Sequence, residues 1–429
     1  MKIIRHTDQD HDKALRFLNR RCLPPAELRQ TVATILDEVR DRGDDAVFEL
    51  TQRFDKANLR PTGLEVSEAE FKAAAKPTNP DLETAVAATL ENVRQFTRQS
   101  LRTPWHNSNA QGAHFGEVFH PLGRVGIYVP GGTAPLVSTA LMTVPIAVEA
   151  GVPEIVVTTP CGPDGSVNPA LLYALSQAGA TEVYKIGGAQ AIAAMAFGTA
   201  SIRPVEKIYG PGNTFVVEAK RQVFGYTGID LLPGPSEILV LADNSARADW
   251  VAADMLAQAE HGKDSQVGLI TNSRRLLDEV IAQLETQSAT LSRQEPLRHV
   301  LEHGTFCILE RSLTEAVNLT NAFAPEHLSL VVEDPESLLP EIRTAGAVYL
   351  GGLAPVAAGD FLAGPSHVLP TAGAGKAFPG LTAEMFQRRT SIVRFSQAAV
   401  NASAPIVQTF AQVEGLDAHG RSVSLRTSP

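Results

Sequence analysis

From Arg124 onward, short apolar runs rich in β-branched residues alternate with longer segments in which apolar residues recur at helical spacing. The first run is RVGIYVP at 124–130, a helix-like segment follows at 137–151, and the alternation continues to AVYLGG at 347–352. Strands that are apolar at nearly every position belong in parallel sheets with helices on both faces. The pattern therefore predicts an α/β fold with mostly parallel sheets.

On either side of this region the pattern changes. The segments 26–55 and 81–101 read as amphipathic helices, and we expect them to cover one of the sheets. After Gly375 the alternation is lost, and residues 380–396 and 406–422 predict a small helical tail. The number of strand–helix units exceeds what one doubly wound sheet usually holds, so we expect two α/β domains.

Composition narrows the class of protein. The chain has 429 residues, of which 44% are hydrophobic and 20% charged, and its formal net charge is -10. This balance is typical of a soluble globular protein, and the acidic surface argues against nucleic acid or an anionic membrane as the main partner. The longest apolar region, 136–157, contains two prolines and two glutamates, which excludes a transmembrane helix.

Cysteine usage and the N-terminus indicate a compartment. Cys22, Cys161 and Cys307 are far apart and form no CxxC motif, so the sequence predicts neither a disulfide framework nor a thiolate zinc site. The first residues lack the apolar run and small-residue cleavage site of a secretory signal. We therefore expect a cytoplasmic protein.

Four glycine-containing loops mark the ends of predicted elements. Glycines at strand ends let a backbone approach a phosphate or ribose, and helix N-termini there offer free N–H groups. The fingerprint GxGxxG with a downstream acid is absent, so the loops alone name no cofactor. The loops are VPGG at Val129–Gly132, GGAQ at Gly187–Gln190, GPGN at Gly210–Asn213 and PGPSE at Pro233–Glu237.

A carboxylate and an imidazole stand side by side at Glu326 and His327, within NAFAPEHLSL. The pair lies where the helix predicted over 313–324 turns through Pro325 into the strand predicted over 327–332. Such a pair could simply decorate a solvated junction. With backbone near the β conformation, neighbouring side chains point in different directions, so the two groups need not act as one unit.

Three further stretches carry nitrogen and oxygen donors without thiolates. This ligand type suits zinc or manganese with positions left open for a substrate. Read one at a time, each donor has an ordinary explanation as a helix terminus, a cap or an exposed group. The donors are Gln258 and His261 on one face of a helix end, Asp360 and His367 around a Gly-Pro turn, and Glu414 and His419 near the C-terminus.

Taken in order, these motifs resemble the histidinol dehydrogenase family over nearly the whole chain. Long ordered matches of this kind are specific. The matching stretches begin with RVGIYVPGG, KIGGAQAIAA, YGPGNTFVVEAKRQVFG and GIDLLPGPSEILVLAD, and they continue with AQAEHG, APEHL, GDFLAGPSHVLPT and EGLDAHGRS.

The resemblance implies oxidation of L-histidinol to the aldehyde and then to L-histidine, with two NAD+ in succession and one zinc ion per site. It also implies roles for individual positions. Those positions are Gln258, His261, Asp360 and His419 for zinc, the same four with Ser236, His327 and Glu414 for substrate, and Tyr128, Gln190 and Asn213 for NAD.

The resemblance further implies a homodimer of two incomplete Rossmann-like domains with small N- and C-terminal helical pieces. The tail would cross to the partner, placing Glu414 and His419 in the neighbouring site. The expected parts are an N-terminal segment 1–23, a first domain 24–125 plus 237–378, an NAD-binding domain 126–236 and a tail 379–429.

Chemistry assigns different steps to the adjacent pair. An imidazole accepts a proton near neutral pH, so His327 is the candidate base for oxidation of the alcohol. A partly desolvated carboxylate has a raised pKa, so Glu326 is the candidate for activating the water that attacks the aldehyde. The metal would fix the pose of the substrate rather than activate water.

The sequence also departs from the family pattern. Val137 stands where a proline is common, Phe361 stands where the family more often has tyrosine, and the tail stretch 381–393 differs. The changes at Val137 and in the tail touch none of the proposed ligands or bases, whereas Phe361 removes one hydroxyl near the metal that the resemblance implies. Two rival hypotheses stay open: a related dehydrogenase that oxidises another small polar alcohol to a carboxylate, and a metal- or nucleotide-binding regulator without turnover.

Overall fold

The computed structural model describes residues 1–20, 24–77, 79–131 and 135–427, so Cys22 and Gly132 lie outside the described residues. It divides the chain into two compact units. The larger unit is Met1–Gln99 with Gly123–Thr382, and the smaller is Ser100–Leu122 with the chain from Ala383 onward. The predicted fold class is confirmed, because the larger unit is an α/β structure built on two parallel sheets.

The first sheet has six parallel strands in the order β1-β11-β10-β9-β12-β13. Its central strands are buried at almost every position, as the apolar runs predicted. The strands are β1 Lys2–Arg5, β9 Glu237–Ala242, β10 Gln266–Thr271, β11 Thr305–Leu309, β12 His327–Val331 and β13 Ala347–Leu350.

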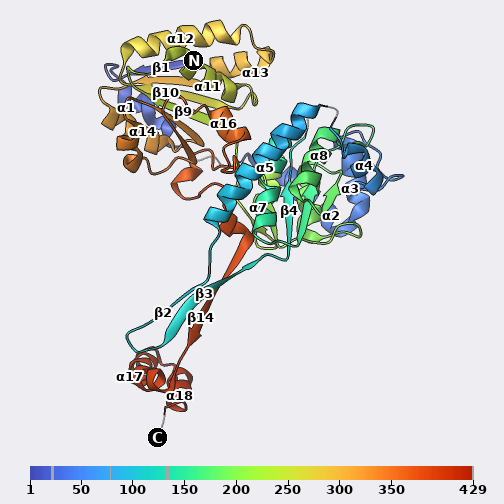
Figure 1. Ribbon diagram of the computed structural model, residues 1–429, viewed down its shortest axis with the longest axis vertical. Coiled ribbons are helices and arrows are strands. Elements are labelled where there is room, and N and C mark those ends of the chain that lie inside the picture. The colour runs from blue at the N-terminus through green and yellow to red at the C-terminus, as the bar shows by residue number, and fades with distance from the viewer. Residues whose placement is uncertain (21–23, 78, 132–134, 428–429) are drawn as a thin grey trace. The chain divides into compact units, whose positions relative to one another are not determined.

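Helices cover both faces of this sheet (Figure 1). Ile238 and Val240 of β9 belong to a core formed with helices α11 Ala248–Ala259, α12 Arg274–Ser288 and α13 Gln294–His299. Leu239 and Leu241 belong to the opposite core, with α14 Leu313–Phe323. Side chains of successive residues of β9 therefore pack into two separate cores on opposite faces of the sheet, because the side chains of a strand alternate between its faces.

The second sheet has five parallel strands in the order β6-β5-β4-β7-β8. Helices α8 Pro169–Ala178, α9 Gly188–Phe197 and α10 Thr214–Val223 connect or follow its strands. The strands are β4 Arg124–Tyr128, β5 Glu154–Thr158, β6 Glu182–Tyr184, β7 Lys207–Tyr209 and β8 Gly228–Ile229.

Three of the N-terminal helices pack on helices that follow strands of this second sheet, although residues 24–125 are predicted to belong with 237–378. Helix α2, Ala26–Arg42, contacts α9 and α10, while α3, Asp44–Phe54, contacts α9 and α4, Glu68–Ala74, contacts α8. Helix α9 is buried from Ala189 to Ala196, so it requires cover on more than one side. The domain boundaries themselves stay a prediction.

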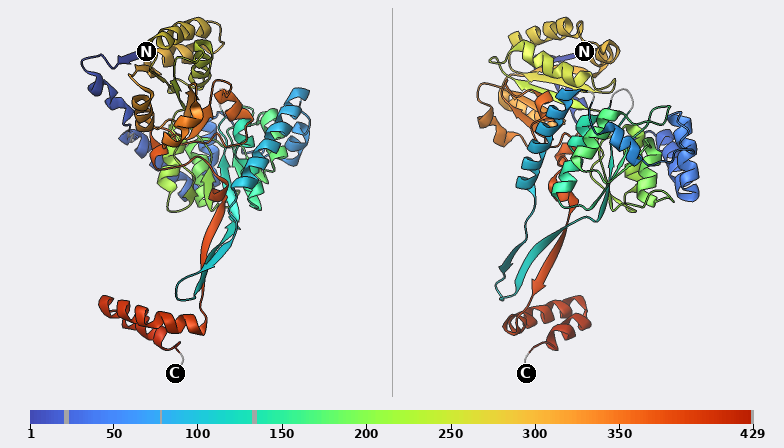
Figure 2. Two further views of the ribbon diagram at one scale, coloured as in Figure 1. Left: turned by 60° about the vertical axis from the view of Figure 1, so that its left-hand side comes forward. Right: turned by 45° about the vertical axis from the view of Figure 1, so that its right-hand side comes forward.

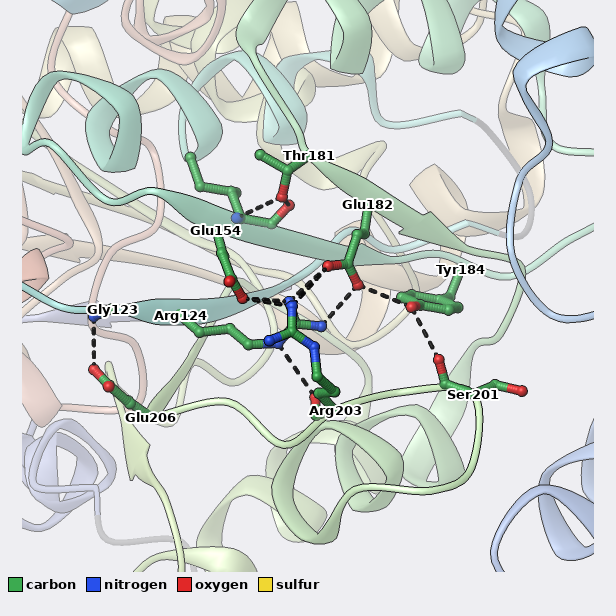
Figure 3. A network of polar contacts seen from close by, with 10 residues as sticks. Gly123, Arg124, Glu154, Thr181, Glu182, Tyr184, Ser201, Arg203 and Glu206 are labelled. Atoms are coloured by element: carbon green, nitrogen blue, oxygen red, sulfur yellow. Dashed lines mark hydrogen bonds and ion pairs between the residues drawn. The ribbon is translucent and has the colours of Figure 1, made fainter.

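The amino ends of the second sheet are joined by an ion network (Figure 3). Arg124, the first residue of β4, donates to Glu182 at 2.6 and 2.7 Å and to Glu154 at 2.8 Å. Glu154 and Glu182 begin β5 and β6. The hydrogen bonds from Arg124 hold the pKa of Glu182 below its usual value. Three neighbouring strands are thus tied together at their first residues.

The smaller unit is not the purely helical tail that the sequence predicted. The segment Gln387–Arg394 forms strand β14, which pairs antiparallel with β3, His114–Pro121, and β3 pairs with β2, Trp105–Ser108. Both views in Figure 2 show β14 beside β3. Helices α17, Gln397–Glu414, and α18, Asp417–Ser424, follow. A strand was missed because its only partner is far away in the sequence.

In the described part of the chain, every helix is too short or too polar to cross a lipid bilayer.

Candidate active site

The adjacent pair lies at the predicted junction between a helix and a strand. Helix α14 ends at Phe323, Ala324 takes a left-handed conformation with φ 52°, and His327 is the first residue of β12. His327 aligns with Ile238 of β9 and with Ala347 of β13. Glu326 and His327 are 6% and 3% exposed, so the reading of the pair as surface decoration is wrong.

Both side chains are held by the backbone of Glu237. The amide of Glu237 donates to Oε2 of Glu326 at 2.7 Å, and Nδ1 of His327 lies 2.8 Å from the Glu237 carbonyl. A carbonyl only accepts, so Nδ1 carries the hydrogen and the neutral ring has its lone pair on Nε2. Oε2 and Nδ1 lie 3.5 Å apart, so the expectation that the side chains point in different directions is wrong.

Glu237 is itself fixed by residues that the sequence analysis did not single out. Arg20 pairs with both carboxylate oxygens of Glu237, and the amide of Ala372 donates to Oε1 at 3.0 Å. Arg20 also donates to the carbonyl of Phe323 at 3.0 Å and stacks on that ring at 3.7 Å. No local motif indicates these contacts, because each partner comes from a distant segment.

The buried charges shift one another's pKa values. Burial raises the pKa of Glu326 to about 8. Burial alone would lower the pKa of His327, but the carboxylates of Glu326 and Asp360 outweigh it and raise the value to about 9. Burial likewise acts to raise the pKa of Asp360, and the neighbouring His327 outweighs it and holds the pKa below its usual value.

Three of the predicted metal donors lie in the larger unit. Gln258 and His261 lie at the C-terminal end of α11, and α11 packs against α16, Val356–Phe361, which carries Asp360. Nε2 of His327 lies 3.2 Å from Oδ1 of Asp360, an ion-pair distance without hydrogen-bond geometry. Nδ1 of His261 donates a hydrogen bond to the Ala257 carbonyl at 3.1 Å. The lone pair on Nε2 is therefore available to bind a metal ion.

Three residues of the predicted site carry unpaired polar atoms, and those of His327 and Asp360 lie 3.2 Å apart. Nε2 of Gln258, Nε2 of His327 and Oδ1 of Asp360 are buried without a hydrogen-bond partner within the described chain. Buried polar groups are rarely left unpaired, so such a cluster indicates a ligand or ion. No group of three His, Cys, Asp or Glu residues suited to a metal occurs among the described residues. Of these four residue types, the predicted metal-binding set has only His261 and Asp360 in the larger unit. Its third member there, Gln258, is an amide and belongs to none of the four types.

The remaining predicted residues have different surroundings. Glu414 ends α17 and His419 lies in α18, so both belong to the smaller unit and both are exposed. Ser236 is half-buried and directly precedes β9. His367 donates from Nδ1 to the Asp360 carbonyl at 3.0 Å, and burial lowers its pKa. His367 therefore supports the segment that carries Asp360.

This cluster lies at the amino ends of the strands. Glu237 and His327 are the first residues of β9 and β12, and α11 returns the chain to the start of β10 shortly after His261. The loop Pro233–Glu237 accordingly precedes a strand of this sheet. The rule that ligands bind at carboxyl ends of parallel strands thus does not locate these groups.

A cavity of about 730 Å³ lies at the carboxyl edge of the other sheet. It is lined by Tyr128 at the end of β4, Thr159 after β5, Gln190 in the first turn of α9, and Asn213 before α10. The structure thus brings Tyr128, Gln190 and Asn213 together, although their role as cofactor contacts stays a prediction. Burial raises the pKa of Tyr128 to about 12, and its hydroxyl accepts from the Gly188 amide at 3.1 Å.

The glycines of these loops pack against other loops. A Cβ at Gly131 or at Gly187 would lie 2.7 Å from the side chain of Pro160. Gly210 has φ +104°, and a Cβ there would lie 2.2 Å from the Tyr128 carbonyl oxygen. These glycines therefore permit contact between neighbouring strand ends, and Gly131 also lines the cavity, so their approach to a ligand stays a prediction.

A parallel α/β scaffold with a strand-end cavity and a separate buried acid–base pair is typical of an enzyme. The family model described as histidinol dehydrogenase matches residues 18–427. The chain belongs to the histidinol dehydrogenase family.

Individual relatives agree with this assignment. The chain is 40% identical to histidinol dehydrogenase of Heliobacterium mobile, over 99% of each chain. It is 47% identical to that of Deinococcus radiodurans, over 92% of this chain and 90% of the relative. A crystal structure of histidinol dehydrogenase from Elizabethkingia anophelis superposes with a TM-score of 0.95 at 34% identity, covering 99% of this chain and 98% of the other.

Proposed function

We propose that this protein oxidises L-histidinol to L-histidine through L-histidinaldehyde, with NAD+ as oxidant and zinc as metal, in the last steps of histidine biosynthesis in the cytoplasm. The observation that carries the proposal is the buried pair Glu326 and His327, held by one backbone unit, with the unpaired Oδ1 of Asp360 3.2 Å from Nε2 of His327. An alcohol-to-acid oxidation needs two proton acceptors, and the pair provides two different ones.

The donor set fits a metal ion. Gln258, His261 and Asp360 present amide, imidazole and carboxylate groups, and His419 would complete the set from the partner subunit. When bound, zinc would hold the amine and imidazole nitrogens of the substrate, and NAD+ would accept hydride. A cation at Asp360 would also cancel the pull of that carboxylate on a proton at His327.

His327 would act on the alcohol. Its Nδ1–H is committed to the Glu237 carbonyl, so Nε2 is the atom that accepts the hydroxyl proton. The same hydrogen bond fixes the orientation of the ring. The aromatic ring of Tyr349 stands beside it, with centroids 6.1 Å apart, and limits its rotation.

Glu326 would act on the aldehyde. Its buried carboxyl has a pKa of about 8, so its ionised form binds a proton far more readily than an ordinary glutamate does. The Glu237 amide holds Oε2, which leaves the other oxygen to take a proton from the attacking water. The two oxidations would then use different neighbouring bases.

The exposed apolar side chains of the smaller unit support a homodimer. Ile406, Phe410 and Val413 recur at helical spacing on α17 and are 47%, 62% and 81% exposed. A stripe of this kind on one helix face is typical of an interface. Docking of the tail on a second copy would cover it and would bring Glu414 and His419 toward that copy.

The direct test follows NADH absorbance with L-histidinol as substrate. We expect NADH formation that a chelator abolishes and that added zinc restores. No NADH with zinc present would overturn the proposal. NADH formed from another polar alcohol, but not from L-histidinol, would assign the site to a different substrate.

A further inference from the structure

Three residues that line the strand-end cavity each carry a buried hydrogen-bond acceptor without a partner among the described residues. Oδ2 of Asp55, Oγ1 of Thr159 and Oε1 of Gln190 are buried and unpaired among the described residues. Thr159 and Gln190 are 0% and 1% exposed, so solvent does not satisfy them. A buried site with unpaired acceptors is built for a ligand that brings donors, such as hydroxyl or amino groups.

Asp55 has a fixed place at the wall of this cavity. It directly follows α3, its amide donates to the Thr51 carbonyl at 2.8 Å, and the next residue, Lys56, has a positive φ of 62°. The ammonium group of Lys56 donates to the Arg53 carbonyl at 2.8 Å. The backbone therefore holds the carboxylate at the cavity, while the neighbouring cation has a partner elsewhere.

The cavity has a negative charge without a cation to match it. Among the described residues that line it, there is no lysine, arginine or histidine, and Asp55 is the only carboxylate. Burial raises the pKa of Asp55 to about 6. The charge of Asp55 adds to the effect of burial in raising the pKa of Tyr128 and of Cys161. A ligand phosphate placed directly against the Asp55 carboxylate would meet repulsion, and no cation among the described lining residues would offset it.

We propose that Asp55 makes this cavity select a dinucleotide with free adenosine-ribose hydroxyls, NAD+, against its 2′-phosphorylated form, NADP+. The carboxylate would accept hydrogen bonds from the ribose hydroxyls, whereas a 2′-phosphate would place its charge beside Asp55. This inference rests on the proposed function, because it requires a dinucleotide in this cavity.

The assignment also accounts for the missing fingerprint. In an ordinary dinucleotide-binding domain, the acid that binds the ribose follows the glycine motif by about 20 residues within the same unit. Here the carboxylate comes from the end of α3, ahead of the sheet in the chain, and α3 packs against α9 of that sheet. A search downstream of the glycine loops cannot find it.

The test compares the dissociation constants of NAD+ and NADP+ for the full-length wild type and for Asp55→Asn, measured by calorimetry without substrate. In the wild type we expect NADP+ to bind at least about tenfold more weakly than NAD+. Asp55→Asn should weaken NAD+ and reduce that ratio at least about tenfold. Asp45→Asn, an exposed acid on the same helix, should leave the ratio unchanged.

The outcomes separate the two proposals. Wild-type protein that binds neither dinucleotide would overturn the proposed function together with this inference. NAD+ binding with an unaltered ratio in Asp55→Asn, or equal binding of both dinucleotides by the wild type, would overturn the inference alone. Should Asp55→Asn fail to fold, 2′-deoxy-NAD+ tests the wild type directly, and binding equal to that of NAD+ would contradict the role of Asp55.

Discussion

Glu326 and His327 are adjacent in the chain, and both hydrogen-bond to the main chain of one residue, Glu237. Glu326 accepts from the amide of Glu237, and His327 donates to its carbonyl. Adjacent residues on a strand normally face opposite sides, so convergence requires the turn at Ala324 and Pro325 that precedes β12. The sequence placed both residues at this turn but could not show where their side chains meet.

Substitution of each group should affect a different half-reaction. Glu326→Gln keeps an acceptor for the Glu237 amide but loses the base, so oxidation of L-histidinaldehyde should fall about a hundredfold while oxidation of L-histidinol to the aldehyde is largely spared. His327→Asn should lower the first oxidation by a similar factor. Stopped-flow NADH formation from each substrate measures the two steps separately.

A matched control is Glu310→Gln. Glu310 is also buried beside a histidine, with Nε2 of His11 at 2.8 Å, but it lies at the carboxyl end of β11, whereas Glu326 precedes the amino end of β12. We expect both half-reactions to survive this change. Equal losses in both steps for Glu326→Gln would contradict the division of labour.

Among the elements, the strands and helices after Arg124 were predictable because each is a local pattern with a clear period. The packing of α2, α3 and α4 was not predictable, since an amphipathic helix shows which face is buried but not against what. Strand β14 was missed for a related reason, because its alternation becomes a strand only beside β3. The link between Arg20 and Glu237 joins segments that no sequence spacing connects.

The N-terminal segment should matter for catalysis through this link. Arg20→Met leaves the buried carboxylate of Glu237 with the Ala372 amide as its remaining partner among those described above, so the free energy of unfolding should fall by about 3 kcal/mol. Because Glu237 orients both bases, both half-reactions should decline together. Thermal unfolding and the two half-reaction rates provide the measurements.

The exposed pair Arg247 and Asp249 offers a control for this prediction. Arg247→Met removes the same chemical group from a solvated ion pair and should leave the unfolding midpoint and both rates unchanged. A loss confined to one half-reaction in Arg20→Met would show that Glu237 does not serve the two bases jointly.

At the scale of the whole molecule, the chain forms two units, and each contains residues that the family resemblance assigns to the site. Gln258, His261 and Asp360 lie in the larger unit, while Glu414 and His419 lie in the smaller. The sequence supplied all five through the family resemblance. The dimer that would unite them depends on contacts between copies, which the fold of one chain does not determine.

Heterodimers whose two chains carry different inactivating substitutions test whether the tail of one chain completes the active site of the other. One chain carries Glu326→Gln and the other carries His419→Asn, and two affinity tags isolate the mixed dimer. If the tail crosses, one of the two sites is intact and about half of the wild-type activity should return. If the tail serves its own chain, both sites remain defective.

The reciprocal dimer is the control, with both substitutions on one chain and a wild-type partner. A crossing tail leaves both of its sites defective, whereas a tail that stays with its own chain leaves one intact. Activity in this dimer, together with none in the first, would rule out a shared site.

The contacts of Glu237 have one further consequence. Its amide and carbonyl orient the two bases, and every amino acid except proline presents the same two groups at that position. Replacement of Glu237 by alanine would therefore report only the contacts of its side chain with Arg20 and the Ala372 amide, and it would overlook the hydrogen bonds that align the bases. An amide-to-ester replacement at position 237 removes the N–H that donates to Glu326 and leaves every side chain in place. Main-chain substitution, unlike side-chain mutagenesis, can therefore test how the bases are aligned.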